Sequence, residues 1–304
     1  MKLCRFRIDG KTRIGCLAPD LEGKVLDVSD IVGSEDLMSF FDDRANLKRL
    51  DRYVTENGAS ADMRLDQTDL EFLVPVQSPG KIVCLAGNYG AHIAESGYQE
   101  PEGRANFTPQ LFLKPATTLL AHGGVIELGK TNVRVGWETE LAVVIGKSGR
   151  NIKAADADRY IFGYTILNDI SERGLNSGIN ERHMREMDEF CDWLAGKWFD
   201  GFAPCGPWLV TKDEVPYPHA LEIKFYLNGD LRQHGSTQEM IFSISEQIEY
   251  VSSIMTLKPG DIISTGTPAG AGLGGTTASL ADGDELVCEI EGIGRLVNTV
   301  RWTA

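Results

Sequence analysis

The amino-acid sequence predicts a β-rich α+β fold in two parts, a small N-terminal α+β domain at residues 1–74 and a larger domain at residues 80–304. The chain has 304 residues, which exceeds the usual size of one domain. After residue 80, strand-like runs separated by glycine, proline and aspartate turns outnumber helical patterns. Between the two parts, "VPVQSPGK" has the proline and glycine content of a linker.

The N-terminal part begins with a predicted hairpin. In "LCRFRIDGKTRIGCL", the pair Asp9-Gly10 separates two β-like runs, which is a strong turn signal. "KVLDVSDIV" is a third candidate strand. One or two short helices should follow, because Ser34 is a good N-cap residue and Gly58 a good terminator.

The larger part alternates strands with turns. Helical patterns occur near residues 91–96, 154–160, 180–194 and 243–255. The predicted strands are "KIVCLAG", "PQLFLKP", "ELAVVIG", "YIFGYTILND", "PWLVT", "LEIKFYLNG", "DIISTGTP", "DELVCEI" and "RLVNTVRW". This proportion is typical of a β-rich α+β domain, not of alternating βαβ units.

The charge of the chain excludes some classes of partner. A net charge of -14 and a pI near 4.8 argue against nucleic acid and against anionic membranes, which bind basic surfaces. The first residues, "MKLCRFRIDG", contain no apolar signal segment, and no apolar run reaches membrane-spanning length. Six scattered cysteines without metal-ligand spacing are expected to be free thiols in a reducing cytoplasm.

The run "VGWETELAVVIG" carries Glu138 and Glu140 two positions apart, so a strand places both carboxylates on one face. The remaining residues of both faces are mostly small or apolar, which is typical of a strand covered on both sides. Two carboxylates about 7 Å apart repel each other by about 2 kcal/mol at an effective dielectric constant of 20. We therefore expect a positive charge between them.

A divalent cation would supply that charge, because Mg²⁺, Mn²⁺ and Ca²⁺ prefer oxygen ligands. Alternatively, the pair lies at a solvated strand end beside lysine or arginine. A third carboxylate, Asp169, ends the apolar run "YIFGYTILND", where a buried strand emerges. Three carboxylates from two strands leave positions on an octahedral ion for water and substrate, so Asp169 favours the metal.

Four further residues are candidates for catalysis or binding. His92 and Glu95 lie three apart in "GNYGAHIAE", so a helical turn would orient the imidazole as a general base, although without other context an ordinary surface pair is the favoured explanation. Lys197 lies among aromatic residues in "GKWFDGF" and needs an anion, either a ligand or Asp200. Arg173 could bind a substrate carboxylate or form a surface salt bridge.

Two other features carry less information. "GAGLGG", residues 270–275, fits a dinucleotide-binding motif, but the run after it lacks a helical apolar stripe, so that function is excluded on context. The polar stretches 96–110 and 174–192 could cover a site or be plain surface loops.

Several segments between residues 81 and 301, taken in their order along the chain, resemble the fumarylacetoacetate hydrolase family. The resemblance is carried by "KIVCLAGNYGAHIAE", "LFLKPATTLL", "WETELAVVIGKSGRNI", "GYTILNDISER", "GKWFDGFAPCGPWLV", "LNGDLRQHGST" and "LKPGDIISTGTPAGAG". It implies a mixed β-roll with short helices after a smaller N-terminal domain, a homodimer, and Mg²⁺, Mn²⁺ or Ca²⁺ acting on β-diketo or α-keto acids.

The resemblance also implies roles for single residues. The metal ligands would be Glu138, Glu140 and Asp169. His92 with Glu95 would activate water, and Lys197 would support a developing enolate or oxyanion. Arg173, Asn176 and Thr267 would contact the substrate. Asn176 stands where relatives often carry glutamine, and the stretch 174–192 is particular to this chain, so both affect the choice of substrate.

The expected reaction is hydrolytic C–C cleavage of a 2,4-diketo acid, an acylpyruvate, in which water attacks the distal carbonyl and the metal holds the enolate of pyruvate. Decarboxylation of an oxaloacetate-like acid at the same site is the alternative, followed by lyases of ureido or sugar acids. A binding module that has lost its chemistry would lack the set of polar residues found here.

Overall fold

The structure is a computed structural model that describes residues 1–17, 23–35, 37, 44–57, 64–97, 107–179, 181–272 and 279–303. Five predicted features extend beyond these residues. They are the helical region between Ser34 and Gly58, the polar stretches 96–110 and 174–192, the helical pattern at 180–194 and the glycine-rich run 270–275, and only their described parts are discussed.

The elements of the described residues are mostly strands. The strands are β1 (Lys2–Ile8), β2 (Lys11–Leu17), β3 (Lys24–Asp27), β4 (Arg64–Asp66), β5 (Glu71–Leu73), β6 (Ile82–Ala86), β7 (Gln110–Lys114), β8 (Leu119–Leu120), β9 (Val125–Leu128), β10 (Val135–Gly136), β11 (Thr139–Ile145), β12 (Ile161–Asn168), β13 (Ser171–Glu172), β14 (Ala203–Thr211), β15 (Glu222–Leu227), β16 (Asp230–Ser236), β17 (Ile262–Ser264), β18 (Glu285–Ile290) and β19 (Gly294–Trp302). The α-helices are α1 (Ser29–Val32), α2 (Arg44–Asn57), α3 (Gly90–Glu95), α4 (Asp188–Ala195) and α5 (Ile244–Ile254). Short 3-10 helices are η3 (Gln67–Asp69), η5 (Ala116–Thr118), η6 (Ala154–Tyr160), η7 (Lys212–Glu214) and η8 (Thr237–Glu239).

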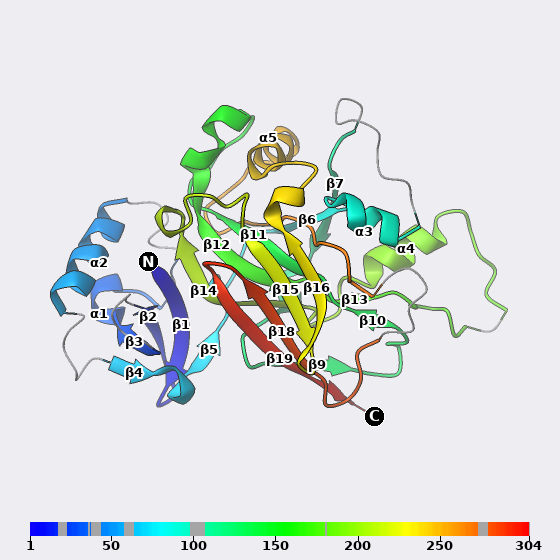
Figure 1. The fold of residues 1–304 in the computed structure, drawn as a ribbon, viewed down its shortest axis with the longest axis horizontal. Coiled ribbons are helices and arrows are strands. Elements are labelled where there is room, and N and C mark those ends of the chain that lie inside the picture. Colours follow the sequence, from blue (N-terminus) through cyan, green and yellow to red (C-terminus); the bar gives the residue numbers. More distant parts are fainter. Residues whose placement is uncertain are drawn as a thin grey trace.

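The strands form mixed sheets. The long sheet has the order β4-β3-β2-β1-β14-β12-β11-β17-β6-β7, with β5 beside β1 and β8 beside β14. A second sheet, β16-β15-β18-β19-β9, lies in front of the middle of the long one in Figure 1. Most neighbours are antiparallel, but β6–β17, β8–β14 and β9–β19 are parallel. The β-rich α+β fold expected from the sequence is thereby confirmed.

The N-terminal strands are continuous with the long sheet. Strand β1 pairs with β14, and Leu3 lies opposite Leu209. Elements β1 to β5, α1 and α2 gather at one end of the molecule, on the left in Figure 1. The division into domains at residues 74–80 stays a prediction, because it concerns independent folding and not the position of these strands.

Two hairpin turns follow from local residue chemistry. Asp9 and Gly10 both have positive φ, and Ile8 pairs with Lys11 across the turn. Asn228 and Gly229 make the equivalent turn between β15 and β16. Turns with positive φ at both central positions suit the right-handed twist of a hairpin, which explains why these dipeptides predicted them.

The helices match the sequence patterns less evenly. Helix α5 begins after Ser243, whose side chain and that of Glu246 form a reciprocal capping box. The pattern at 180–194 predicts one long helix, and this expectation is wrong, because α4 begins only at Asp188. Arg182 and Arg185 instead form ion pairs with the carboxylate of Asp188, so side-chain contacts organise the preceding segment.

Strand β11 is buried on both faces, as its composition predicts. Leu141, Val143 and Ile145 join a core cluster that includes residues of the five-stranded sheet, whereas Ala142 and Val144 join a second cluster on the opposite face. Glu140 shares the parity of Ala142, so its carboxylate points away from the five-stranded sheet. The strand therefore presents its carboxylates toward the second face.

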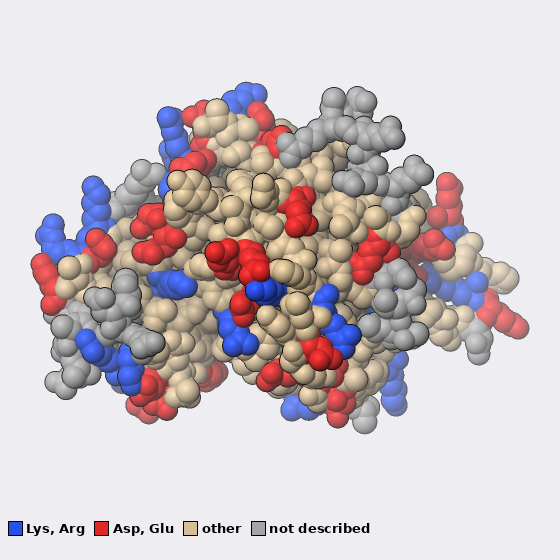
Figure 2. All heavy atoms as spheres, viewed as in Figure 1, with Lys and Arg blue, Asp and Glu red and all other residues tan. Residues whose placement is uncertain are grey.

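The described surface agrees with the composition. On the face shown in Figure 2, acidic and basic side chains are interspersed, and the described basic residues form no continuous area there. Within the described ranges, no helix has both the length and the apolar character needed to span a membrane. All six cysteines are free thiols, and five of them are buried while Cys191 is exposed.

Candidate metal and enolate site

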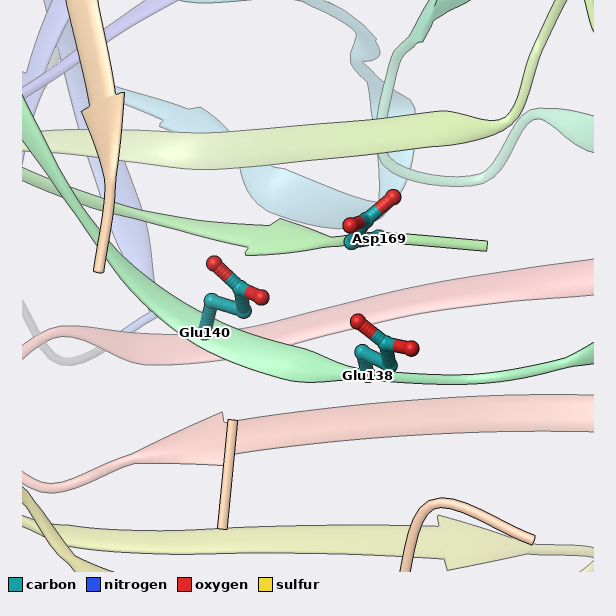
Figure 3. A group of neighbouring side chains, drawn as sticks. All are labelled: Glu138, Glu140 and Asp169. Carbon is teal, nitrogen blue, oxygen red and sulfur yellow. The ribbon is translucent and has the colours of Figure 1, made fainter. Parts of the chain in front are cut away.

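Glu138, Glu140 and Asp169 converge in the interior of the protein. Each offers a carboxylate oxygen, and these atoms lie within 4.8 Å of one another. Figure 3 shows the three side chains between β11 and the end of β12, with their carboxylates turned toward a common space. Their residues are at most 9% exposed. The structure thus brings together the three residues that the sequence proposes as metal ligands, and their role as ligands stays a prediction.

Backbone contacts fix this convergence. The amide of Glu138 donates to Asn168 Oδ1 at 2.9 Å, and the amide of Asp169 donates to the carbonyl of Glu138 at 2.8 Å. Thr139 pairs with Asn168 where β11 and β12 run antiparallel. The third carboxylate thus follows directly from the register of two neighbouring strands.

Buried cations contact the carboxylates. Lys197 Nζ lies 2.9 Å from Glu138 Oε2 and 2.7 Å from Asp169 Oδ2. Arg173 Nη2 donates to Glu138 Oε1 at 2.8 Å. The sequence analysis expected both cations to bind anions and gave Asp200 as one option for Lys197. In the structure, Lys197 forms ion pairs with Glu138 and Asp169.

Aromatic rings complete the surroundings of Lys197. Its ammonium lies 5.0 Å from the ring centre of Phe112 and 5.8 Å from that of Trp193. These faces attract a cation while they exclude water. The lysine is therefore held as a charged group in an apolar wall.

Lys114 is a site residue that the sequence analysis missed. Its Nζ donates to Asp169 Oδ1 at 2.6 Å and to the carbonyl of Ile170 at 3.1 Å, and the side chain is fully buried. The available signal was a lysine inside the apolar run "LFLKP", directly before a proline. A buried lysine requires an anion, but the sequence alone does not indicate which one.

The neighbouring charges shift the pKa values of Glu138 and Glu140 in opposite directions. Burial opposes ionisation of Glu138, but Lys197 and Arg173 outweigh burial and lower its pKa to about 2. Burial and the charges of Asp169 and Glu138 raise the pKa of Glu140 well above its ordinary value. Burial alone would lower the pKa of Lys197, but Asp169 and Glu138 hold it above its usual range.

Arg173 has unused donors. Its Nε and Nη1 are buried and donate to no partner among the described residues, while Nη2 donates to Glu138. Gly136 gives the guanidinium its room, because a Cβ atom there would lie 2.7 Å from Arg173 Nε. A buried donor without a partner is costly, so this arrangement suits a bound anion.

His92 and Glu95 lie on the same side of helix α3, as predicted. His92 Nδ1 and Glu95 Oε2 are 3.8 Å apart, which exceeds a hydrogen bond, and Nδ1 is buried without a described partner. Glu95 instead accepts hydrogen bonds from the amides of Gly270 and Ala271 at 2.8 and 3.4 Å. Burial opposes the charge of Glu95, but His92 and the Gly270 amide outweigh it and lower its pKa.

The two other predicted substrate contacts make internal hydrogen bonds. Asn176 has a positive φ, and its Nδ2 donates to Asp192 of helix α4 at 2.8 Å. Thr267 Oγ1 donates to the carbonyl of Thr139 at 2.9 Å and accepts from Gln233 Nε2 at 2.9 Å. Their roles toward a substrate stay predictions.

The chemistry of this donor set fits a divalent cation. The site offers carboxylate oxygens from two strands, and hard oxygen ligands suit Mg²⁺, Mn²⁺ or Ca²⁺. Glu140 supports the fit further, because it has no cationic partner among the described residues and accepts only neutral hydrogen bonds, from Ser264 Oγ at 2.5 Å and from the Gly266 amide at 2.9 Å.

A cavity of about 500 Å³ lies elsewhere, between β5, β14 and the strands β18 and β19. Its lining includes Phe72, His122, Trp208 and Arg295. None of its lining residues belongs to the carboxylate site. The chemistry of the carboxylate site thus rests on its donor set and not on the size of a cavity.

Comparison with known proteins adds independent information. Residues 81–301 match the family described as "Fumarylacetoacetate (FAA) hydrolase C-terminal". A mitochondrial oxaloacetate tautomerase of Bos taurus is 42% identical over 237 residues, which are 78% of this chain and 71% of that protein.

Solved structures are similar over the whole chain. Fumarylacetoacetate hydrolase from the psychrophilic Exiguobacterium antarcticum has a TM-score of 0.78 at 32% identity and covers 100% of both chains. Maleylpyruvate hydrolase from Sphingobium sp. SYK-6, in complex with manganese(II) ion and pyruvate, has a TM-score of 0.75 at 28% identity and also covers 100% of both chains.

Proposed function

Because this chain belongs to the fumarylacetoacetate hydrolase family, we propose that it is a divalent-metal-dependent enzyme that interconverts the keto and enol forms of an oxaloacetate-type acid. The oxaloacetate tautomerase of Bos taurus, with its 42% identity, supports this choice of substrate over the acylpyruvates expected from the sequence. Both kinds of substrate require stabilisation of an enolate, so the same residues serve either reaction.

One observation carries the proposal. The carboxylates of Glu138, Glu140 and Asp169 meet in a buried space beside Arg173, whose Nε and Nη1 have no partner among the described residues. A cation-binding group thus lies next to a preformed anion-binding group. That juxtaposition suits a small keto acid, which has oxygen donors at one end and a carboxylate to be bound.

Glu138, Glu140 and Asp169 would hold Mg²⁺ or Mn²⁺, with Ca²⁺ as a further option. When bound, the cation supplies positive charge beside the keto oxygen, which lowers the energy of the enolate by several kcal/mol. Arg173 would orient the substrate through the carboxylate. Asp169 and Glu138 hold the pKa of Lys197 above its usual range, so in the metal-free site the lysine supplies positive charge beside the carboxylates.

His92 is the candidate for moving the proton. Its residue is 9% exposed, and it lies close enough to Glu138 that a positive charge on its ring would lower the pKa of that carboxyl. Enolisation needs a base that takes a proton from the carbon next to the keto group and returns it. An imidazole with a buried, unpartnered Nδ1 has a ring nitrogen available for that transfer.

Hydrolytic cleavage of a 2,4-diketo acid is the second candidate. The pair His92 and Glu95 favours it, because a carboxylate that closes the 3.8 Å gap would orient the imidazole to activate water. The resemblance to maleylpyruvate hydrolase, solved with manganese and pyruvate, points the same way. A homodimer and a cytoplasmic location stay predictions.

The test uses metal-stripped protein reloaded with Mg²⁺ or Mn²⁺. The enol absorbance of oxaloacetate, the release of CO₂ and the release of pyruvate from a panel of acylpyruvates are followed separately. Metal-dependent loss of the enol signal without CO₂ supports the tautomerase, whereas pyruvate release from an acylpyruvate supports the hydrolase.

Two variants control for indirect effects. Glu140→Gln changes a predicted ligand, and Glu127→Gln changes an exposed glutamate that pairs with Arg301. The first should lose the metal-dependent rate and the second should keep it. Equal activity of the two variants, or no metal-dependent reaction with any of these substrates, would refute the proposal.

A further inference from the structure

Lys114 is a buried cation that lies against the carboxylate site. It ends strand β7, its side chain is fully buried, and its ammonium donates to Asp169 Oδ1 and to the carbonyl of Ile170. Lys197 takes the other oxygen, Asp169 Oδ2. Each oxygen of this carboxylate therefore faces its own ammonium group.

The buried charges around the site balance one another. Three carboxylates, Glu138, Glu140 and Asp169, share the site. Three cations lie against them, namely Lys114, Lys197 and Arg173. When all six are ionised, a divalent cation adds two positive charges that these six side chains do not compensate.

Uncompensated charge in a buried site is expensive, and a ligand of opposite charge relieves it. Two positive charges match a ligand with two negative charges. Oxaloacetate-type dicarboxylates carry two at neutral pH, whereas simple acylpyruvates carry one. The charge balance therefore distinguishes oxaloacetate-type acids from simple acylpyruvates. The fold and the three carboxylates alone do not make this distinction.

We propose that Lys114 is a positioning residue that sets the charge of the metal-loaded site and thereby selects dianionic over monoanionic substrates. This inference rests on the proposed function, since it assumes a divalent cation on the three carboxylates. Lys114 acts through Asp169 and through its electrostatic field, because its ammonium donates to Asp169 and to the carbonyl of Ile170.

The experiment separates metal binding from anion binding. Wild type, Lys114→Met and Lys114→Arg are titrated with Mn²⁺ by calorimetry and by electron paramagnetic resonance. The Mn²⁺-loaded proteins are then titrated with oxalate, a chelating dianion, and with glycolate, a chelating monoanion. Circular dichroism checks folding, and Lys114→Gln replaces the methionine variant if the latter does not fold.

Lys114→Met should bind Mn²⁺ at least as tightly as wild type, because one positive neighbour is gone. The Mn²⁺-loaded variant should bind glycolate roughly tenfold and oxalate roughly a hundredfold more weakly than the Mn²⁺-loaded wild type, because the Coulomb energy scales with the charge of the ligand. Lys114→Arg keeps the charge and should stay within about threefold of wild type for both anions.

Two results would overturn the inference. If Mn²⁺ affinity falls in Lys114→Met, the lysine supports the ligand geometry and does not set the charge. If the affinities for oxalate and for glycolate fall by the same factor in this variant, Lys114 does not discriminate between ligands by their charge. Failure of the wild type to bind Mn²⁺ would instead refute the proposed function, and with it the basis of this inference.

Discussion

Replacing Glu138 by glutamine should destabilise the metal-free protein in a pH-dependent way. Lys197 and Arg173 overcome the burial of Glu138 and lower its pKa from 4.5 to about 2 in the folded protein. At 1.36 kcal/mol per pH unit, this difference corresponds to about 3 kcal/mol of stability at pH 7. Because the folded pKa is the lower one, this stability is present above pH 4.5 and is lost as the pH falls toward 2.

Glu140 provides a matched control on the same strand face. Burial, Asp169 and Glu138 raise its pKa well above the ordinary value, so the sign is opposite. The folded metal-free protein then prefers a protonated Glu140, and its ionisation costs stability as the pH rises above 4.5. Glu140→Gln should therefore leave the metal-free fold as stable as wild type at pH 7, or more stable.

The assay is urea unfolding of chelator-treated protein at pH 7 and at pH 3.5. The wild type should exceed Glu138→Gln by about 3 kcal/mol at pH 7 and by about 2 kcal/mol at pH 3.5, because the unfolded carboxylate takes up protons first. Equal destabilisation by Glu138→Gln and Glu140→Gln, or a difference that does not change with pH, would refute the electrostatic assignment.

Three further substitutions test single contacts. Gly136→Ala places a Cβ atom 2.7 Å from Arg173 Nε, so steady-state kinetics should show KM for the keto acid raised about tenfold with a smaller change in kcat. His92→Asn should slow turnover at least about a hundredfold while calorimetry shows unchanged Mn²⁺ affinity, and a parallel loss of Mn²⁺ binding would contradict its role as a base. Lys197→Met leaves two buried carboxylates with fewer partners and should cost about 3–5 kcal/mol in urea unfolding, and a cost below about 1 kcal/mol would show that the ion pairs are not needed for stability.

Local chemistry explains which parts of the fold could be predicted. The turn at Asp9-Gly10 and the helix near residues 243–255 depend on neighbouring residues, and both occur where the sequence predicts them. The pairing of β1 with β14 joins residues about two hundred positions apart, as in Leu3 with Leu209. No local pattern encodes that partner, because it depends on how the whole long sheet is assembled.

The site likewise contains residues that a local pattern predicts and residues that only the folded structure brings together. Glu138 and Glu140 could be predicted, because a strand has a fixed period of two, and Asp169 because its strand is apolar up to its end. The partners of the carboxylates were not predictable in this way. Lys114 comes from β7, which is not adjacent to β12 in the sheet, and only the folded structure brings its ammonium to Asp169.

The pair His92 and Glu95 shows how a correct periodicity can still leave the chemistry undetermined. Helical spacing puts both side chains on one side of α3, yet Glu95 accepts hydrogen bonds from Gly270 and Ala271 while His92 Nδ1 has no partner among the described residues. Water activation and enolisation both use the imidazole as a general base, and a carboxylate beside the ring would assist either reaction. The contacts of Glu95 with Gly270 and Ala271 therefore show why the spacing of His92 and Glu95 in the sequence could not by itself assign the reaction.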